Sequence, residues 1–141
     1  MENEKNNSLQ NCDAESLAMA IAYILVEKKA RDIKVYNVSE DSSVTDFYVN
    51  ATGTSRTNVA ALADEVTYKI GLSGRDELRI EGRGENEWLL VDYGDVIVNV
   101  FDRPAREFYN FDRLMSPDKE VDISGVIEEV NNKYDINKKD E

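Results

Sequence analysis

A strand–helix–strand pattern in the middle of the chain constrains the fold most. Residues 46–51, DFYVNA, are rich in the aromatic and β-branched residues that favour strands. In residues 57–71 apolar side chains recur at the spacing of one helix face, and residues 77–82 again predict a strand. A helix between two strands is a crossover unit, which usually makes those strands parallel. The chain is therefore expected to form an α/β domain.

Patterns of the same two kinds extend this unit in both directions. The expected helices are 13–29, 57–71 and 102–115, and the expected strands are 32–38, 46–51, 77–82, 88–93 and 96–101. Asp13 and Asp102 suit the N-caps of the first and third helices. Gly94 and Asp95 alone separate the last two strands, which fits a tight hairpin with glycine first. These elements predict an α/β fold with a mixed five-stranded sheet flanked by helices.

Length and composition predict one folded domain with a segment at each end. A chain of 141 residues is long enough for one sizeable core and too short for two. Residues 1–12 are polar and are expected to form a flexible N-terminal segment, whereas residues 13–115 form the domain. Residues 116–141 form an acidic C-terminal extension. Apolar residues at helical spacing between 123 and 130 allow one short helix there, before a mobile tail that begins at residue 133.

Two residue types that are absent or rare narrow the available chemistry. The chain has no histidine, which removes the commonest general base and the usual partner of a serine nucleophile. Cys12 is the only cysteine, so the chain can form neither an internal disulfide nor a thiolate metal site. Any catalysis would have to use carboxylates, lysines or hydroxyl groups.

The charge balance favours a basic protein as partner. The chain has 17 Lys and Arg against 29 Asp and Glu, a net charge of −12. Such a surface repels the phosphates of nucleic acids and attracts basic proteins, although negative charge also serves solubility alone. No apolar run reaches the ~20 residues of a membrane helix, and the polar N-terminus resembles neither a signal peptide nor a transit peptide. We expect a cytoplasmic protein without a membrane contact.

The turn at residues 52–55, Thr-Gly-Thr-Ser, joins a strand to a helix, a place where phosphate sites often lie. It holds one glycine and no lysine, so it matches neither the P-loop nor the GxGxxG pattern. It resembles the Gly-Ser turn of nucleotidyltransferases, but those enzymes need two metal-holding carboxylates one residue apart on the next strand. Glu77 and Glu81, the carboxylates of that strand, are four residues apart. The pattern favours a structural turn whose hydroxyl groups cap the helix, with nucleotide binding at Gly53–Ser55 as the alternative.

The strand at residues 88–93 carries the only tryptophan of the chain. Side-chain alternation sorts its residues into two sets, Trp88, Leu90 and Asp92 on one face and Leu89, Val91 and Tyr93 on the other. If only one face is core, the other presents side chains that anchor protein interfaces. If helices cover both faces, Trp88 is a core residue instead. The pattern leaves both possibilities open.

Several motifs together resemble the ribosomal silencing factor family, also called Iojap-like proteins. DIKVYNV, TDFYVNATGTSRTNVAALAD, IEG, WLLVDYGDVIVNVF and REFYNFDRLM occur in the order and spacing of that family, over roughly residues 13–115. The resemblance implies a nucleotidyltransferase-like fold without the catalytic carboxylates, and hence no enzymatic activity and no cofactor. It further implies a translational repressor that binds the large ribosomal subunit through universal ribosomal protein number fourteen. The bound factor blocks joining of the small subunit when nutrients are scarce.

The resemblance also implies a partner surface and an oligomeric state. By family position that surface comprises Trp88, Leu89, Asp92, Tyr93, Asp95, Arg106 and Tyr109. The free protein is expected to be a homodimer with little direct contact to nucleic acid. Two positions depart from the family: Asn99 stands where histidine is usual, and Met115 where tryptophan is frequent. The alternatives are a divergent nucleotidyltransferase that binds a nucleotide at Gly53–Ser55 and a dimeric adaptor for another basic protein.

Overall fold

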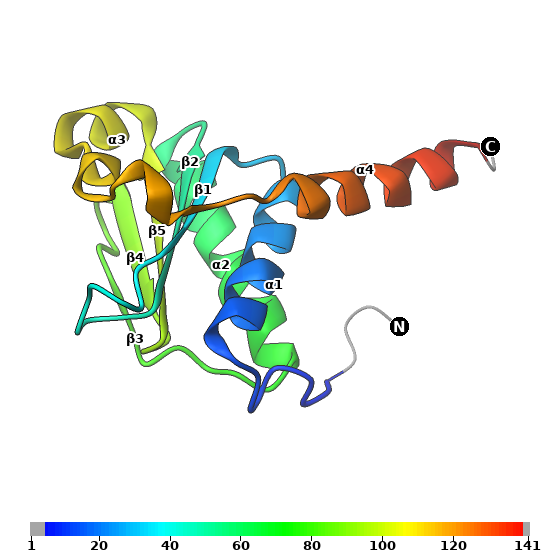
Figure 1. Cartoon of the computed structure of the whole chain (residues 1–141). Coiled ribbons are helices and arrows are strands. Elements are labelled where there is room, and N and C mark those ends of the chain that lie inside the picture. The colour runs from blue at the N-terminus through cyan, green and yellow to red at the C-terminus, as the bar shows by residue number, and fades with distance from the viewer. Residues whose placement is uncertain (1–4, 140–141) are drawn as a thin grey trace.

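The computed structural model describes residues 5–139 and shows a mixed sheet with two long helices packed against one of its faces (Figure 1). The helices are α1 (Ala14–Glu27), α2 (Arg56–Leu72), α3 (Arg103–Tyr109) and α4 (Ser124–Lys139), with short 3-10 helices η1 (Phe111–Leu114) and η2 (Pro117–Lys119). The strands are β1 (Arg31–Asn37), β2 (Phe47–Gly53), β3 (Arg79–Glu81), β4 (Trp88–Asp92), β5 (Val96–Asp102) and β6 (Glu120–Val121). The predicted α/β class is confirmed.

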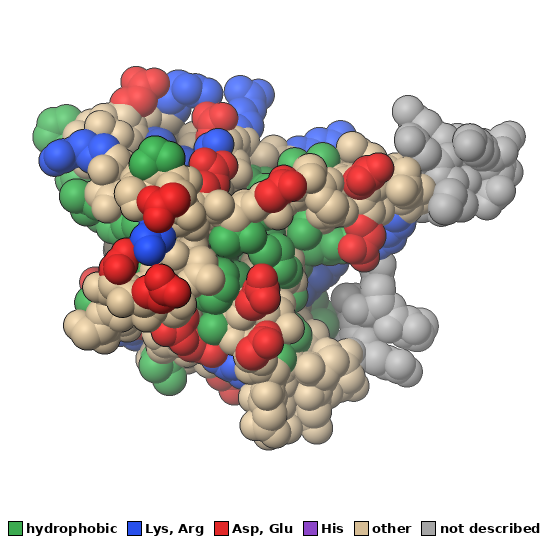
Figure 2. All heavy atoms as spheres, in the orientation of Figure 1, with side chains coloured by type: hydrophobic (Ala, Val, Ile, Leu, Met, Phe, Trp, Pro, Cys, Tyr) green, Lys and Arg blue, Asp and Glu red, His purple; other side chains and the backbone are tan. Residues whose placement is uncertain are grey.

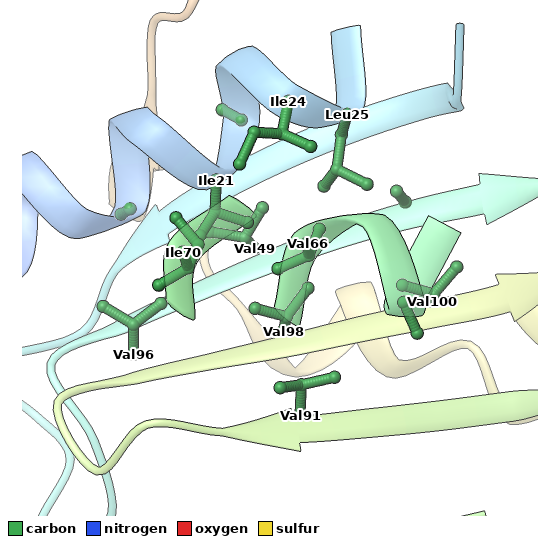
Figure 3. Close-up of a cluster of buried hydrophobic side chains, with 14 of the residues drawn as sticks. Ile21, Ile24, Leu25, Val49, Val66, Ile70, Val91, Val96, Val98 and Val100 are labelled. Atoms are coloured by element: carbon green, nitrogen blue, oxygen red, sulfur yellow. The ribbon is translucent and has the colours of Figure 1, made fainter. Parts of the chain in front are cut away.

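The core lies between the sheet and the pair α1 and α2. Alternate residues of the central strands point toward these helices, because side chains alternate between the two faces of a strand. Figure 3 shows the contacts of this layer, made by Ile21, Ile24, Leu25, Val66 and Ile70 of the helices with Val49, Val91, Val96, Val98 and Val100 of the strands. Asp13 caps α1 and Ser55 caps α2, as expected, since each side chain accepts a hydrogen bond from a backbone N–H of the first turn.

The sheet has six strands in the order β3-β4-β5-β2-β1-β6, one more strand than the sequence predicted. β2 and β5 are parallel, and the other neighbouring pairs are antiparallel. The crossover through α2 therefore gives β3 the same direction as β2, but β4 and β5 lie between them. The predicted hairpin is confirmed: the Tyr93 N–H donates to the Val96 carbonyl at 2.9 Å, and Gly94 has a φ of 91°.

The third helix is shorter than predicted. Asp102 caps it, and Pro104 occupies its first turn as expected, but the helix ends at Tyr109 and not at residue 115. Asn110 has a φ of 48°, in the left-handed region where asparagine is tolerated and where helices end. The 3-10 helix η1 then turns the chain back toward the sheet. The expected continuous helix over 102–115 is thus wrong, because a left-handed residue interrupts it.

Both terminal segments pack more closely on the domain than predicted. Residues 5–12, expected to be flexible, are tied to the end of α2 where the Leu9 N–H donates to the Ser73 carbonyl at 2.8 Å. In the C-terminal extension, β6 pairs with β1, and α4 is helical as far as Lys139 instead of ending before residue 133. Apolar side chains of α4 face the core, and Val130 is buried. Residues 1–4 and 140–141, the ends of the two predicted segments, lie outside the described residues.

Candidate functional site: the open face of the sheet

The face of the sheet turned away from α1 and α2, here called the open face, carries aromatic and polar side chains. Strand register places them in rows: Asn50 of β2 lies beside Asn99 of β5, and Phe101 of β5 lies beside Trp88 of β4. Asn50 and Asn99 are fully buried although they lie in strands of otherwise apolar character. A buried amide is costly unless each of its polar groups has a partner. The open face must therefore supply those partners.

An aromatic cluster connects the open face to the segment that follows β5. The Trp88 ring centroid lies 5.0 Å from that of Phe101, 4.9 Å from that of Tyr109 and 6.1 Å from that of Phe111. Phe101 contributes from the sheet, Tyr109 from α3 and Phe111 from η1. These distances suit the tilted and edge-on contacts that aromatic rings favour. We refer to these four residues as the aromatic cluster.

A chain of side-chain hydrogen bonds runs beneath the aromatic cluster. The Trp88 indole N–H donates to Asn99 Oδ1 at 3.0 Å. Asn99 Nδ2 donates to Asn50 Oδ1 at 3.0 Å, and Asn50 Nδ2 donates to Asp112 Oδ1 at 3.0 Å. The Tyr36 hydroxyl donates to the same carboxylate oxygen at 2.9 Å. These bonds supply the partners that the two buried amides require.

The same carboxylate is paired with an arginine of α3. Arg106 Nε donates to Asp112 Oδ2 at 2.6 Å, and Arg106 Nη2 donates to Asp112 Oδ1 at 3.2 Å. The remaining terminal nitrogen of Arg106 donates to the Thr52 hydroxyl at 2.9 Å. Its guanidinium carbon also lies 5.7 Å from the centre of the Phe101 ring, within the range of a cation–π contact. Arg106 and Asp112 therefore fasten α3 and η1 to the sheet.

The Asp112 carboxylate accepts hydrogen bonds from three side chains, those of Arg106, Asn50 and Tyr36. Burial alone would raise the pKa of the Asp112 carboxyl, but hydrogen bonds from Arg106 and Asn50, with the Arg106 charge, hold that pKa below its ordinary value of 3.8. The Tyr36 hydroxyl shows the opposite direction, because burial and the neighbouring Asp112 charge raise its pKa. At neutral pH the pair consists of a charged carboxylate and a neutral phenol, so that the phenol donates and the carboxylate accepts.

This lowered pKa predicts how stability depends on pH. Because the folded protein binds the Asp112 proton less tightly than the unfolded chain does, the carboxylate stabilises the fold above the ordinary Asp value. That contribution is lost as pH falls through 3.8 and below it. We expect Asp112→Asn to lower the free energy of unfolding by about 1.5–3 kcal/mol at pH 7 and by progressively less as the pH falls below 3.8. Urea titrations of both proteins at several pH values measure the difference, and a difference independent of pH would contradict the assignment.

The structure divides the residues that family position assigns to the partner surface. Trp88, Asp92, Arg106 and Tyr109 lie on the open face or on the helix that borders it. Leu89 and Tyr93 point the other way into the core, where they are 0% and 4% exposed. They were expected on the partner surface, but the pleat of β4 turns them under α2, and they support the surface only from below.

The two acidic residues of the hairpin already have basic partners. Asp92 Oδ1 accepts from the Gly94 N–H at 2.7 Å, and Asp92 Oδ2 lies 3.2 Å from Nε of Arg79. Asp95 lies on the hairpin that joins β4 to β5, and its Oδ1 atom lies 2.7 Å from Nη2 of Arg75. A basic partner that binds either carboxylate must therefore compete with an internal arginine, which reduces the gain from the new ion pair.

The turn before α2 uses its polar groups internally. The Asn58 N–H donates to Ser55 Oγ at 3.0 Å, and the Thr54 N–H donates to Asn58 Oδ1 at 2.9 Å, so the two side chains cap the helix start reciprocally. A Cβ atom on Gly53 would lie 2.9 Å from a Val59 methyl group, so glycine allows the strand and helix to approach closely. This geometry matches the structural turn favoured by the sequence.

A large cavity lies away from the open face. It has a volume of about 500 Å³ and lies between α1, α2, α4 and the N-terminal segment, where Figure 2 shows hydrophobic side chains in the hollow beneath α4. Its walls include Leu9, Met19, Tyr23, Ile70 and Val126.

Across residues 5–139 no helix is both long enough and apolar enough to span a bilayer.

Sequence reasoning missed most of the hydrogen-bonded residues of the open face. Asp112 lies within the family motif REFYNFDRLM, but the motif does not indicate which side chains it contacts. Those contacts depend on the left-handed turn at Asn110, which brings η1 back to the sheet. Asn50 and Asn99 did leave a signal, because a polar residue within a run of buried strand residues needs a hydrogen-bond partner. Such a polar residue indicates that hydrogen-bond partners must exist, but it does not identify them.

Comparisons with known proteins agree with the motifs. The family described as ribosomal silencing factor during starvation matches residues 11–141. A ribosomal silencing factor from Halalkalibacterium halodurans is 34% identical over 101 residues, 72% of this chain and 86% of the relative. The mouse mitochondrial assembly of ribosomal large subunit protein 1 is 32% identical over 94 residues, 64% of this chain and 41% of that protein.

A solved structure shows the same fold. The crystal structure of a protein from Chromobacterium violaceum superposes with a TM-score of 0.71 at 30% sequence identity, covering 80% of this chain and 97% of that one. Its agreement extends over most of the sheet-and-helix domain described above. Together, the family match over nearly the whole chain, the similar relatives and the shared fold lead to one conclusion. The chain belongs to the ribosomal silencing factor family.

Proposed function

We propose that this protein is a translational repressor that binds the large ribosomal subunit through universal ribosomal protein number fourteen and blocks joining of the small subunit. The observation that carries the proposal is the exposed edge of the aromatic cluster: Trp88 is half-buried, Tyr109 is exposed beside it, and Phe108 is 80% exposed against Tyr109. Aromatic side chains grouped in this way concentrate binding energy in protein interfaces. The ribosome as target is supported by the names of the relatives.

The charge of the chain supports contact with a ribosomal protein in preference to ribosomal RNA. The net charge is −12, and acidic side chains are spread over the face of the molecule shown in Figure 2. Phosphate backbones are bound by Lys and Arg, which displace condensed counterions, and a surface rich in carboxylates opposes this. A basic protein on the subunit surface gains from the same charges in its rate of encounter.

The proposal is tested with purified large subunits, with and without ribosomal protein number fourteen. We expect the chain to cosediment with complete subunits and to bind the isolated ribosomal protein, because the contact is assigned to protein. It should also lower the yield of joined ribosomes when small subunits are added. Equal binding to subunits that lack protein fourteen would contradict the assigned partner. Binding to a different basic protein instead would favour an adaptor role.

We infer that the protein is not an enzyme, and the turn before α2 gives a direct test. The N–H groups of Thr54 and Asn58 are bonded to side chains of the turn itself, and Arg56 lies within 3.7 Å of carboxylate oxygens on Glu85, Glu87 and Asp102. A nucleotide would have to displace these groups to reach the helix start. We expect calorimetric titration with each nucleoside triphosphate and magnesium to show no specific binding. Micromolar affinity would revive nucleotide transfer as the function.

The free protein is proposed to act in the cytoplasm as a homodimer. Exposed hydrophobic patches on free proteins commonly mark surfaces that another chain covers. Phe108, Tyr109 and Leu114 are exposed together at the α3 end of the molecule, which fits such a contact. Sedimentation equilibrium of the purified chain distinguishes a dimer from a monomer.

A further inference from the structure

We propose that Asp112 is the positioning residue of the partner surface: it sets the orientation of the Trp88 side chain through two asparagines. The same carboxylate holds α3 against the sheet through Arg106. The inference rests on the proposed function, because it takes the aromatic cluster as the surface that binds the ribosomal protein. Asp112 itself lies beneath that surface and acts through the residues it orients.

The hydrogen-bond chain from Trp88 to Asp112 has a fixed polarity. An indole N–H can only donate, and a carboxylate can only accept, so both ends of the chain are determined by their chemistry. Each asparagine between them must accept on the Trp88 side and donate on the Asp112 side, which is the arrangement observed. The carboxylate therefore determines which way both amides are turned, and with them the acceptor that holds the indole.

The position of α3 depends on a polar attachment more than on apolar packing. The helix has only seven residues, and within it Ala105 alone is buried, so apolar packing of α3 itself contributes little to its position. Arg106 supplies the polar attachment, with hydrogen bonds to Asp112 on η1 and to Thr52 on β2. Tyr109 lies one helical turn further along and packs on Trp88. Asp112 thus contacts both halves of the surface, the indole through the amides and the α3 aromatic through Arg106.

Asparagine at position 112 has nearly the shape of aspartate but the wrong chemistry for this network. Both oxygens of Asp112 accept from Arg106, and Oδ1 also accepts from Asn50. If the amide nitrogen takes the place of Oδ1, it meets the Asn50 nitrogen, and two donors oppose each other. Reversal of Asn50 and then of Asn99 would relieve that conflict but would place an amide N–H against the Trp88 N–H. If the amide nitrogen takes the place of Oδ2, it meets Arg106 Nε, which is also a donor. The change of one oxygen to nitrogen is transmitted to the indole in the first orientation. In the second it weakens the attachment of α3 through Arg106. Neither requires a change in side-chain volume.

The experiment compares wild type, Asp112→Asn and the control Glu107→Gln. Glu107 is an exposed residue of α3 that pairs with Arg103, so its substitution removes one negative charge from the same segment and leaves the network intact. Trp88 is the only tryptophan, so intrinsic fluorescence reports on this side chain alone. For Asp112→Asn we expect emission at longer wavelength, greater quenching by acrylamide and about tenfold weaker binding to large subunits. Glu107→Gln should match wild type in fluorescence and in affinity.

Asn50→Ala provides a second route to the same result. It removes the link between Asp112 and Asn99 but leaves the bonds of Asp112 to Arg106 and Tyr36. It should reproduce the fluorescence change, and combining it with Asp112→Asn should add little further change, because both act on one chain of bonds. Circular dichroism melts identify any variant that fails to fold, and the remaining variant then decides the question.

Changed fluorescence with weakened binding in Asp112→Asn or Asn50→Ala supports the positioning role. Unchanged fluorescence in a folded variant overturns it, and so does changed fluorescence with unchanged affinity. If the wild-type chain does not bind large subunits, the proposed function fails. The fluorescence comparison then still decides whether Asp112 orients Trp88.

Discussion

Replacing Trp88 with alanine is expected to weaken binding to the large ribosomal subunit by about thirtyfold or more, the effect of losing about 2 kcal/mol at an interface centre. The side chain is half-buried and packs against Phe101, Tyr109 and Phe111, so its removal deletes the middle of the aromatic cluster. The same contacts mean that the fold also loses stability. Affinity from calorimetry or cosedimentation and the melting temperature from circular dichroism must therefore be measured together.

Trp88→Phe is the matched control for this prediction. A phenyl ring retains aromatic packing but cannot donate to Asn99, so it separates the apolar contribution from the hydrogen bond. We expect the affinity of Trp88→Phe to lie between that of wild type and that of Trp88→Ala. Normal affinity in a folded Trp88→Ala protein would show that the partner binds elsewhere. A loss of melting temperature alone would make Trp88 a structural residue.

Replacing Phe101 with alanine is expected to lower the free energy of unfolding by about 3–5 kcal/mol, the range for a large aromatic side chain in a core. Phe101 is 0% exposed, although its side chain lies on the open face and not on the side of α1 and α2. Trp88 and Arg106 cover it, so truncation leaves a cavity beneath the surface that α3 borders. Urea unfolding followed by circular dichroism measures the loss.

Phe108→Ala serves as the control of the same residue type. Phe108 is 80% exposed on α3, so its truncation should change the unfolding free energy by no more than about 0.5 kcal/mol. If Phe108 belongs to the partner surface, this variant binds large subunits more weakly and melts like wild type. A small stability loss in Phe101→Ala would mean that α3 covers the open face only loosely.

Much of the fold could be predicted because local chemistry determines it. Asp13, Ser55 and Asp102 accept backbone hydrogen bonds at the starts of α1, α2 and α3, and such caps can be read from a few neighbouring residues. The hairpin at Gly94 likewise depends on adjacent residues alone. The end of α3 was missed because Asn110 suits a helix interior poorly but not prohibitively, and its left-handed conformation became evident only in the structure.

The candidate site was only partly predictable because its contacts join distant parts of the chain. Alternation correctly separated the Trp88 set from the Leu89 set, but it could not say which set faced the core. The structure shows that the Leu89 set faces the core, because α1 and α2 pack on that side of the sheet. Asp112 binds side chains 62 and 76 positions earlier, Asn50 and Tyr36. No local pattern encodes a pairing over that separation.

The two-residue strand β6 has a consequence for how the protein behaves when it is concentrated. It pairs with Val35 and Tyr36 of β1, a seven-residue strand whose outer border would otherwise have no partner strand. Unpaired strand borders template the addition of further chains and lead to aggregation. At the other border of the sheet, β3 has only three residues and offers little template. A small part of the C-terminal extension thus interrupts the outer border of β1 and hinders the pairing of that strand with other copies of the chain.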